Sequence, residues 1–173
     1  MNFYELAKSR YSVRKFKPEH VSQEELDIIL KAGHVAPTGC NFQAFRVLVI
    51  NSDEGAKKLP LCTDSHFHAP TALLVCYHKK ECWYRKKYDG APCGVLDATI
   101  VGTHLMLQAH EIGVGSTWVM SFDPEALRRE YQIPEELEPT VLLVMGYPAE
   151  DAAPAPQHDT FRPLEELVSY ETF

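Results

Sequence analysis

The chain lacks the features that mark a membrane-spanning or an exported protein. It has no run of about 18 apolar residues, the length at which a membrane-spanning helix becomes a candidate. Its first residues, Met1 to Glu5, are polar and lack the apolar centre of a signal peptide. We therefore expect a cytoplasmic protein with no membrane partner.

The cysteines do not form a recognisable pattern. There are 5 of them, at scattered positions, and no Cys-x-x-Cys pair occurs. Without an export signal, this usage favours a reducing compartment over a disulfide framework. Cys62, His66 and His68 lie close together, but their spacing matches no standard zinc module. We predict no metal site, and we keep a small Cys/His metal protein as a competing hypothesis.

Basic residues are scarce. The chain has 17 Lys and Arg against 24 Asp and Glu, for a net charge of −7. Nucleic-acid binding usually leaves a basic footprint, so we expect no nucleic-acid partner, although a local basic pocket for one phosphate remains compatible with this charge. The length of 173 residues and the hydrophobic fraction of 45% predict a single domain, residues 1–173, with one core.

Familiar catalytic motifs are also missing. The sequence contains no Gly-x-Ser-x-Gly, no recognisable Ser/His/Asp order and no motif that places a pair of carboxylates. An enzyme with this sequence does not display an acid, a base or a nucleophile of its own. That absence favours chemistry carried by a cofactor.

The hydrophobic pattern alternates helices with about four short strands, which indicates an α+β or α/β class. The predicted helices cover residues 2–9, 22–33, 97–113, 123–131 and 163–170. The predicted strands cover residues 45–50, 72–77, 114–119 and 140–145. Residues 146–160 are rich in proline and alanine, and we expect them to form an extended arm that docks on a partner subunit.

Three helix starts carry capping signals. Ser22 and Glu25 form a capping box. Asp97 is predicted to cap the longest helix, and Asp123 followed by Pro124 opens the next one.

Basic and hydroxyl side chains are concentrated in residues 9–17 of this acidic chain. Arg10 and Arg14 offer forked donors that suit a phosphate or the carbonyl oxygens of a planar ring, and Ser12 adds a hydroxyl. A solvated basic turn is the competing interpretation. Arg162, far along the chain, could also bind a phosphate, although an isolated arginine is most often a surface residue.

Residues 36–43 form a polar loop directly before the first predicted strand. Thr38, Asn41 and Gln43 supply donors and acceptors together, which suits the mixed edge of a heteroaromatic ring. An ordinary helix-to-strand loop is the alternative. Residues 113–118 are superficially similar to a dinucleotide fingerprint, but the third glycine is missing and the segment follows a helix. Its glycines permit close backbone approach, and Trp118 is more often a core residue than a ligand wall.

The order and spacing of four motifs resemble the nitroreductase family over nearly the whole chain. The matching residues are Arg10, Ser12, Arg14 and Phe16, then Ala36, Pro37, Thr38, Asn41 and Gln43, then Gly113, Gly115, Ser116 and Trp118, and finally Gly146-Tyr147-Pro148 with Arg162 to Leu167. Gln43-Ala44-Phe45 replaces the usual Gln-Pro-Trp, and the chain is short for the family. These departures put the substrate preference in doubt more than flavin binding.

The resemblance implies an α+β sandwich with a mainly antiparallel sheet flanked by helices, in an interlocked homodimer with FMN at the subunit interface. The arm, about residues 147–173, would dock on the partner. The implied FMN-binding residues are Arg10, Tyr11, Ser12, Arg14, Pro37, Thr38, Gly39, Asn41, Gln43, Thr117, Trp118, Val119 and Arg162. Of these, Thr38, Asn41 and Gln43 would come from the other subunit, and the backbone of residues 117–119 would lie near the ring.

The activity implied by the resemblance is transfer of hydride from NADH or NADPH, through FMN, to a nitroaromatic, a quinone or another small acceptor, with ping-pong kinetics. No side chain is expected to be catalytic in its own right. A flavin-binding sensor or storage module without meaningful turnover is the alternative that the same motifs support. The sequence leaves open the acceptor, the nicotinamide preference and any redox role for Cys40.

Overall fold

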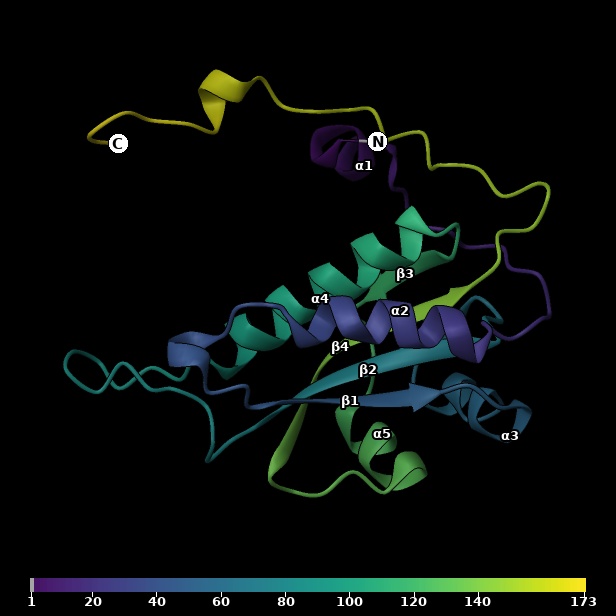
Figure 1. Ribbon diagram of the computed structural model, residues 1–173, viewed down its shortest axis with the longest axis horizontal. Coiled ribbons are helices and arrows are strands. Elements are labelled where there is room, and N and C mark those ends of the chain that lie inside the picture. The colour runs from purple at the N-terminus through teal and green to yellow at the C-terminus, as the bar shows by residue number, and fades with distance from the viewer. Residues whose placement is uncertain (1) are drawn as a thin grey trace.

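One antiparallel sheet organises the structure, a computed structural model that describes residues 2–173 (Figure 1). The strand order is β1-β2-β4-β3, and every neighbouring pair is antiparallel. The strands are β1 (Phe45–Ile50), β2 (Thr71–His78), β3 (Gly115–Val119) and β4 (Leu137–Gly146). All four predicted strands are confirmed, and the fold class is α+β.

Within residues 2–173, five α-helices and four short 3₁₀ segments connect and cover the strands. The helices are α1 (Phe3–Ser9), α2 (Gln23–His34), α3 (Asp53–Ala56), α4 (Gly94–Glu111) and α5 (Pro124–Tyr131). The 3₁₀ segments are η1 (Gly39–Asn41), η2 (Leu59–Leu61), η3 (Asp64–His66) and η4 (Leu164–Glu166). The capping box predicted at Ser22 and the Asp123 cap are both confirmed.

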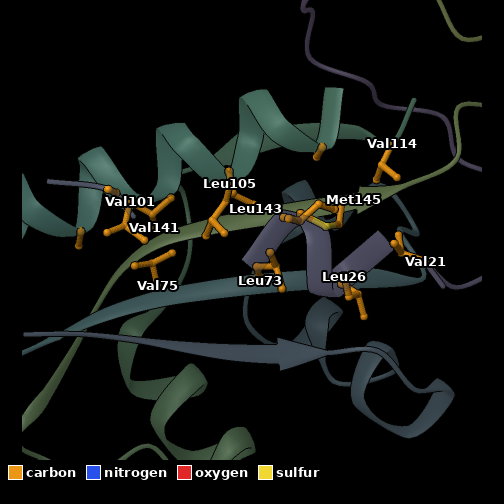
Figure 2. Close-up of a cluster of buried hydrophobic side chains, with 14 residues drawn as sticks. Val21, Leu26, Leu73, Val75, Val101, Leu105, Val114, Val141, Leu143 and Met145 are labelled. Carbon is orange, nitrogen blue, oxygen red and sulfur yellow. The ribbon is translucent and has the colours of Figure 1, made fainter. Parts of the chain in front are cut away.

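Successive side chains of a strand point to opposite sides of the sheet. Both faces of this sheet are buried, because other elements cover each of them. On one face, Leu73 and Leu143 pack with Leu26 of α2 and with Val101 and Leu105 of α4 (Figure 2). The other face is covered by α5 and the segment around η2, as Figure 1 shows for α5. Complete burial of a leucine side chain contributes roughly 1.5–3 kcal/mol, so these layers fix the sheet between helices.

Two predicted helices differ from the structure. The longest helix, α4, begins at Gly94 after Cys93, and no side-chain cap precedes it. Asp97 is instead a buried residue inside the first turn. The prediction of a helix over residues 163–170 is wrong, because only the single 3₁₀ turn η4 forms there. Leu164 and Leu167 are 71% and 60% exposed, and a short amphipathic helix without a surface to pack on is only marginally stable.

The first and last described segments, α1 and the C-terminal arm, lie away from the sheet (Figure 1). Beyond residue 152 the chain runs in an extended path outside the helical layer, and α1 lies above α4 (Figure 1). No residue of α1 is buried.

Candidate functional site

Residues 12–14 are fixed along the edge strand β3. Ser12 forms a parallel bridge with Ser116, and the backbone N–H of Val13 donates to the Ser116 carbonyl at 3.0 Å. The Thr117 hydroxyl donates to the Val13 carbonyl at 2.5 Å. Val13 is 2% exposed, whereas Arg14 is exposed. The alternation of an added strand therefore turns Val13 inward and Arg14 outward.

Gly115 permits this close approach. A Cβ at this position would lie 2.7 Å from Cγ2 of Val13, which is closer than real Cβ contacts allow. On its other side the segment is held by the chain that follows β4. The Lys17 N–H donates to the Tyr147 carbonyl at 2.8 Å, and Lys15 forms an ion pair with Asp151.

Most arginines of the chain are engaged with carboxylates. The pairs are Arg46 with Glu81, Arg85 with Asp89, Arg128 with Glu138 and Arg129 with Glu130. Within the described residues, the remaining arginines have no carboxylate partner at ion-pair distance, and these are Arg10, Arg14 and Arg162. They are the same arginines that the sequence singles out for a phosphate or a polar ring.

The surroundings of Arg10 form a cavity of about 790 Å³. It lies between α1 and the C-terminal arm and is lined by Tyr4, Ala7, Lys8, Arg10, His158, Asp159 and Phe161. Burial, and secondarily the charge of Arg10, lowers the pKa of His110, which hydrogen-bonds the Ser9 hydroxyl at 2.9 Å. The lowered pKa favours the neutral imidazole of His110 at this end of α4.

Arg14 reaches over a neighbouring ring. Its guanidinium carbon lies 5.8 Å from the centre of the Phe67 ring, and its Nη1 donates to the Ser12 carbonyl at 3.2 Å. These contacts leave most of its donors directed to solvent.

A buried carboxylate, that of Asp97, supports the loop of residues 36–43. The Gly39 N–H donates to Oδ1 of Asp97 at 2.9 Å, and Asp97 is 3% exposed. The other carboxylate oxygen, Oδ2, is buried and has no hydrogen-bond partner in the described structure. A Cβ at Gly39 would lie 3.1 Å from Cβ of Trp83, so the loop also packs closely on the segment before α4.

The same loop has an unusual backbone. Cys40, Asn41 and Gln43 have φ values of 49°, 57° and 52°, in the left-handed region that non-glycine residues seldom adopt. Each such residue costs on the order of 1 kcal/mol, and such strain is concentrated at functional sites. The Gln43 N–H donates to the Thr38 hydroxyl at 3.0 Å, which closes the loop and leaves the Asn41 and Gln43 side chains exposed.

Three predicted site residues, Thr117, Trp118 and Val119, lie on β3, between the segment of residues 10–14 and the loop of residues 36–43. Thr117 and Val119 are buried, so only their backbone is available to a ligand. Trp118 is half-buried and lies against α4, where a Cβ at Gly102 would be 3.1 Å from its ring.

Within a single chain, the predicted site residues form two groups that lie apart in space. The segment with Arg10, Ser12 and Arg14 lies where β3 begins, beside the end of β4, because Gly115 pairs with Gly146. The loop of residues 36–43 precedes Phe45, which pairs with Tyr77 near the opposite end of the sheet. Arg162 is exposed on the arm and joins neither group.

Sequence reasoning missed two features of this region. Asp97 was predicted as a helix cap, whereas it supports the loop at Gly39. The segment of residues 79–93 contributes lysines and aromatic side chains beside the loop, and the basic and aromatic run from Lys79 to Tyr88 is the signal that could have shown it.

The competing metal hypothesis finds no arranged ligands. Among residues 2–173, no group of three or more His, Cys, Asp or Glu side chains is placed to hold a metal ion. The Cys62 thiol donates to the Lys58 carbonyl, and burial raises its pKa to about 11. No helix of the same residues is long and apolar enough to cross a membrane.

Comparison with known proteins gives the family. The sequence profile described as "Nitroreductase family" matches residues 7–65 and 59–147. This chain belongs to the nitroreductase family. A solved structure of a nitroreductase family protein from Clostridium difficile 630 is 42% identical, with a TM-score of 0.93 and full coverage of both chains.

Two other similar proteins carry more specific names. An FMN-dependent nitroreductase from Clostridium difficile R20291 is 25% identical with a TM-score of 0.80, covering 99% of this chain and 100% of that one. An NADPH-dependent oxidoreductase from Staphylococcus saprophyticus is 26% identical over 172 residues, which is 89% of this chain and 68% of the relative. The chain is thus an oxidoreductase-family protein.

Proposed function

We propose that this protein is an FMN-dependent oxidoreductase that transfers hydride from NADH or NADPH to a small acceptor such as a nitroaromatic or a quinone. The observation that carries the proposal is the set of arginines without carboxylate partners, Arg10, Arg14 and Arg162, in a chain with a net charge of −7. The names of the FMN-dependent and NADPH-dependent relatives support it.

The donor chemistry of these residues fits FMN. A phosphate carries about −1.5 to −2 charges at pH 7, and forked guanidinium donors bind it in a bidentate manner. Ser12 and the main chain of residues 117–119 add neutral donors and acceptors at fixed positions along β3. When bound, FMN supplies the two-electron redox chemistry that no side-chain motif of this chain provides.

The loop of residues 36–43 fits the other edge of a flavin ring. Asn41 and Gln43 each carry a donor and an acceptor on an exposed amide, and Thr38 adds a hydroxyl. We assign Pro37, Thr38, Gly39, Asn41 and Gln43 to flavin contact, together with Tyr11 beside Arg10. The Asp97 carboxylate holds this loop in place by accepting a hydrogen bond from the Gly39 N–H.

A homodimer would bring the two groups of residues together. One chain places them at opposite ends of the sheet, so a single ligand contacts both only if they come from two copies. Val95, Leu96 and Ile100 of α4 are 48%, 61% and 36% exposed, an unpartnered apolar face on the same helix that packs on the sheet. Phe161 and Leu164 on the arm are also exposed, and a second copy would cover these apolar side chains.

Absorption spectroscopy tests the proposal. The purified protein should show a bound-flavin spectrum, and anaerobic addition of NADH or NADPH should bleach it within minutes, with colour returning when an acceptor is added. Bound flavin that neither nucleotide bleaches would instead establish a binding module without turnover. A protein that takes up no added FMN would overturn the proposal.

A further inference from the structure

A hairpin of residues 79–93 projects from the sheet between β2 and α4. The Arg85 N–H donates to the Ala91 carbonyl at 2.9 Å, and the Cys93 N–H donates to the Trp83 carbonyl at 2.8 Å. Arg85 and Asp89 form an ion pair at the tip. We call this segment the basic hairpin, because Lys79, Lys80, Arg85, Lys86 and Lys87 all lie on it.

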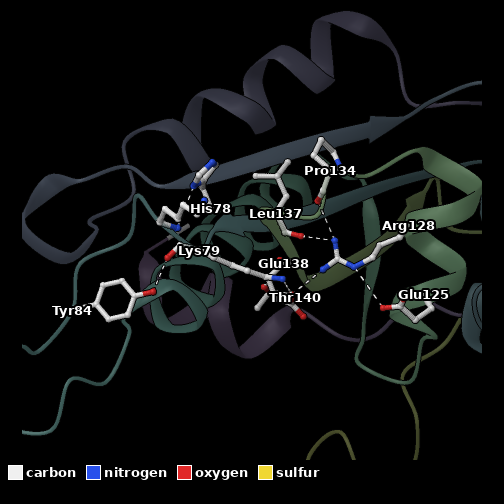
Figure 3. Close-up of polar contacts among 10 residues, drawn as sticks. His78, Lys79, Tyr84, Glu125, Arg128, Pro134, Leu137, Glu138 and Thr140 are labelled. Carbon is white, nitrogen blue, oxygen red and sulfur yellow. Dashed lines mark hydrogen bonds and ion pairs between the residues drawn. The ribbon is translucent and has the colours of Figure 1, made fainter.

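The base of the basic hairpin is fixed to the sheet by hydrogen bonds and ion pairs (Figure 3). The Tyr84 hydroxyl donates to the Lys79 carbonyl at 2.6 Å. Lys79 Nζ lies 3.0 Å from Glu138 of β4, which also pairs with Arg128 of α5 at 2.8 Å. The hairpin is therefore a positioned element, and the side chains along it have defined places.

A cavity of about 520 Å³ lies between the basic hairpin and the loop of residues 36–43. Its lining residues are Phe42, Lys80, Cys82, Trp83, Tyr84 and Lys86. The cavity adjoins the proposed flavin loop directly, because Phe42 belongs to that loop and Gly39 packs on Trp83.

The two lysines of this cavity differ from two other basic residues of the hairpin, Lys79 and Arg85. Lys79 and Arg85 are neutralised by Glu138 and Asp89. Among the residues that the structure describes, no carboxylate lies within ion-pair distance of Lys80 or Lys86. Both lysines line this cavity together with aromatic side chains, so an anion bound here would meet two ammonium groups.

We propose that this cavity is the subsite for the anionic group of an aromatic ligand. Phe42, Trp83 and Tyr84 offer faces or edges to a planar ring, and Lys80 and Lys86 offer charge to a carboxylate on that ring or to a phosphate on a sugar next to it. The assignment rests on the proposed function, which places the reacting ring beside residues 36–43. In a ping-pong reaction, two ligands use the site in turn. The anion is therefore the 2′-phosphate beside the adenine of NADPH, or the carboxylate of an aromatic acceptor.

Binding measurements on the FMN-loaded protein separate these two sources without turnover. One ligand pair is 2′,5′-ADP against 5′-AMP, and the other is 4-nitrobenzoate against 4-nitrobenzyl alcohol, each titrated by calorimetry. The wild-type protein should bind the more anionic member of at least one pair about tenfold more tightly, which equals about 1.4 kcal/mol. The double variant Lys80→Glu/Lys86→Glu should reduce that preference to twofold or less.

The control is Lys87→Glu, which reverses the charge of one lysine immediately outside the cavity. Lys87 lies over the Tyr88 ring at 5.5 Å and does not line the cavity. This variant should retain the wild-type preference within twofold. The milder double variant Lys80→Gln/Lys86→Gln should show the same trend if charge reversal unfolds the hairpin, which circular dichroism and a thermal melt would report.

Each outcome decides the proposal. Loss of preference for 2′,5′-ADP alone assigns the cavity to the nucleotide, loss for 4-nitrobenzoate alone assigns it to the acceptor, and loss for both assigns it to each in turn. A wild-type protein without any preference for the anion, or a folded double variant that keeps it, overturns the proposal. Failure of the proposed function gives a different result, namely flavin that NADH and NADPH do not bleach in the wild-type protein.

Discussion

The backbone N–H of Gly39 donates to Oδ1 of Asp97 at 2.9 Å, across 58 residues of sequence. This hydrogen bond joins the first turn of α4 to the loop that carries Thr38, Asn41 and Gln43. A hydrogen bond to a charged group contributes about 1.5–3 kcal/mol, enough to offset part of the strain in the loop backbone. Asp97 is thus a positioning residue in the proposed site.

Replacing Asp97 should loosen the loop and weaken flavin binding. Asp97→Ala leaves the Gly39 N–H without its acceptor, so we expect the free energy of unfolding to fall by about 1–3 kcal/mol. The Kd for FMN should rise about tenfold or more, because the loop is no longer held in its left-handed conformation. Calorimetric titration with FMN and chemical denaturation give the two quantities.

Thr99→Ala is the control for this change, since Thr99 lies on the exposed side of the same helix and its hydroxyl bonds only the Val95 carbonyl. It should leave FMN affinity unchanged. Asp97→Asn keeps an oxygen for Gly39 and should recover most of the affinity. Equal FMN affinity in Asp97→Ala and wild type would show that the loop does not need this support.

Local signals in the sequence predict much of the fold. The helix starts at Ser22 and at Asp123-Pro124 could be predicted from the sequence, because each capping signal acts within one helical turn. The role of Asp97 was not readable in the same way. An aspartate near a helix start is the usual cap, and only the tertiary structure shows that its carboxylate points to Gly39 instead.

The candidate site was predictable to a similar degree. The motifs select Arg10, Arg14 and Arg162, but they cannot show that every other arginine is paired with a carboxylate, because those pairs join distant segments such as Arg46 and Glu81. The predicted terminal helix failed because its apolar spacing gives a helix only against a surface, and η4 has none in one chain.

A methyl group at Gly115 should displace the segment that carries Arg14. The added Cβ would lie 2.7 Å from Val13, so we expect Gly115→Ala to destabilise the fold by about 1–3 kcal/mol and to weaken FMN binding. Gly113→Ala is the comparison, because a Cβ at Gly113 would meet nothing within 4 Å. The backbone φ of 87° at this position is strained for alanine, so this variant loses stability without a clash. Both variants should lose stability in denaturation, but only Gly115→Ala should lose FMN affinity at a temperature where both are folded. Equal FMN affinity in the two variants would contradict the role given to Val13 and Arg14.

Removal of the Arg14 guanidinium should weaken FMN retention and lower the flavin potential. A charge-assisted hydrogen bond contributes about 1.5–3 kcal/mol, which corresponds to roughly a 10- to 100-fold increase in Kd. The potential falls because positive charge near the reduced ring stabilises the electron-rich state. Arg129→Ala, which removes an exposed arginine paired with Glu130 on α5, should change neither quantity. Unchanged occupancy and potential in Arg14→Ala would remove Arg14 from the site.

The contact between Tyr147 and Glu25 should make stability depend on acidic pH. The Ser22 hydroxyl and the Tyr147 hydroxyl both donate to Glu25, and they lower the pKa of this carboxyl. A lowered folded-state pKa stabilises the protein above the ordinary glutamate value of about 4.3, and this contribution is lost as the pH falls through the folded pKa.

Tyr147→Phe should therefore cost about 1–2 kcal/mol at pH 7, and the difference from wild type should shrink below about pH 4. Denaturation curves between pH 3 and pH 7 measure both effects. Tyr88→Phe removes an exposed hydroxyl and should show no difference at any pH. A Tyr147→Phe deficit that stays constant across this range would mean that Glu25 is not the group concerned.

Subunit complementation tests the central proposal, that one flavin is bound by Arg14 of one copy and by the loop of residues 36–43 of the other. Two differently tagged chains are co-expressed, one carrying Arg14→Ala and the other carrying Asn41→Ala/Gln43→Ala, and the mixed dimer is purified through both tags. Each variant alone should bind FMN poorly, whereas the mixed dimer should contain one intact site and bind one FMN per dimer with the wild-type Kd. A mixed dimer that binds FMN no better than either variant alone would show that both groups of residues act within the same chain, and would contradict the shared site.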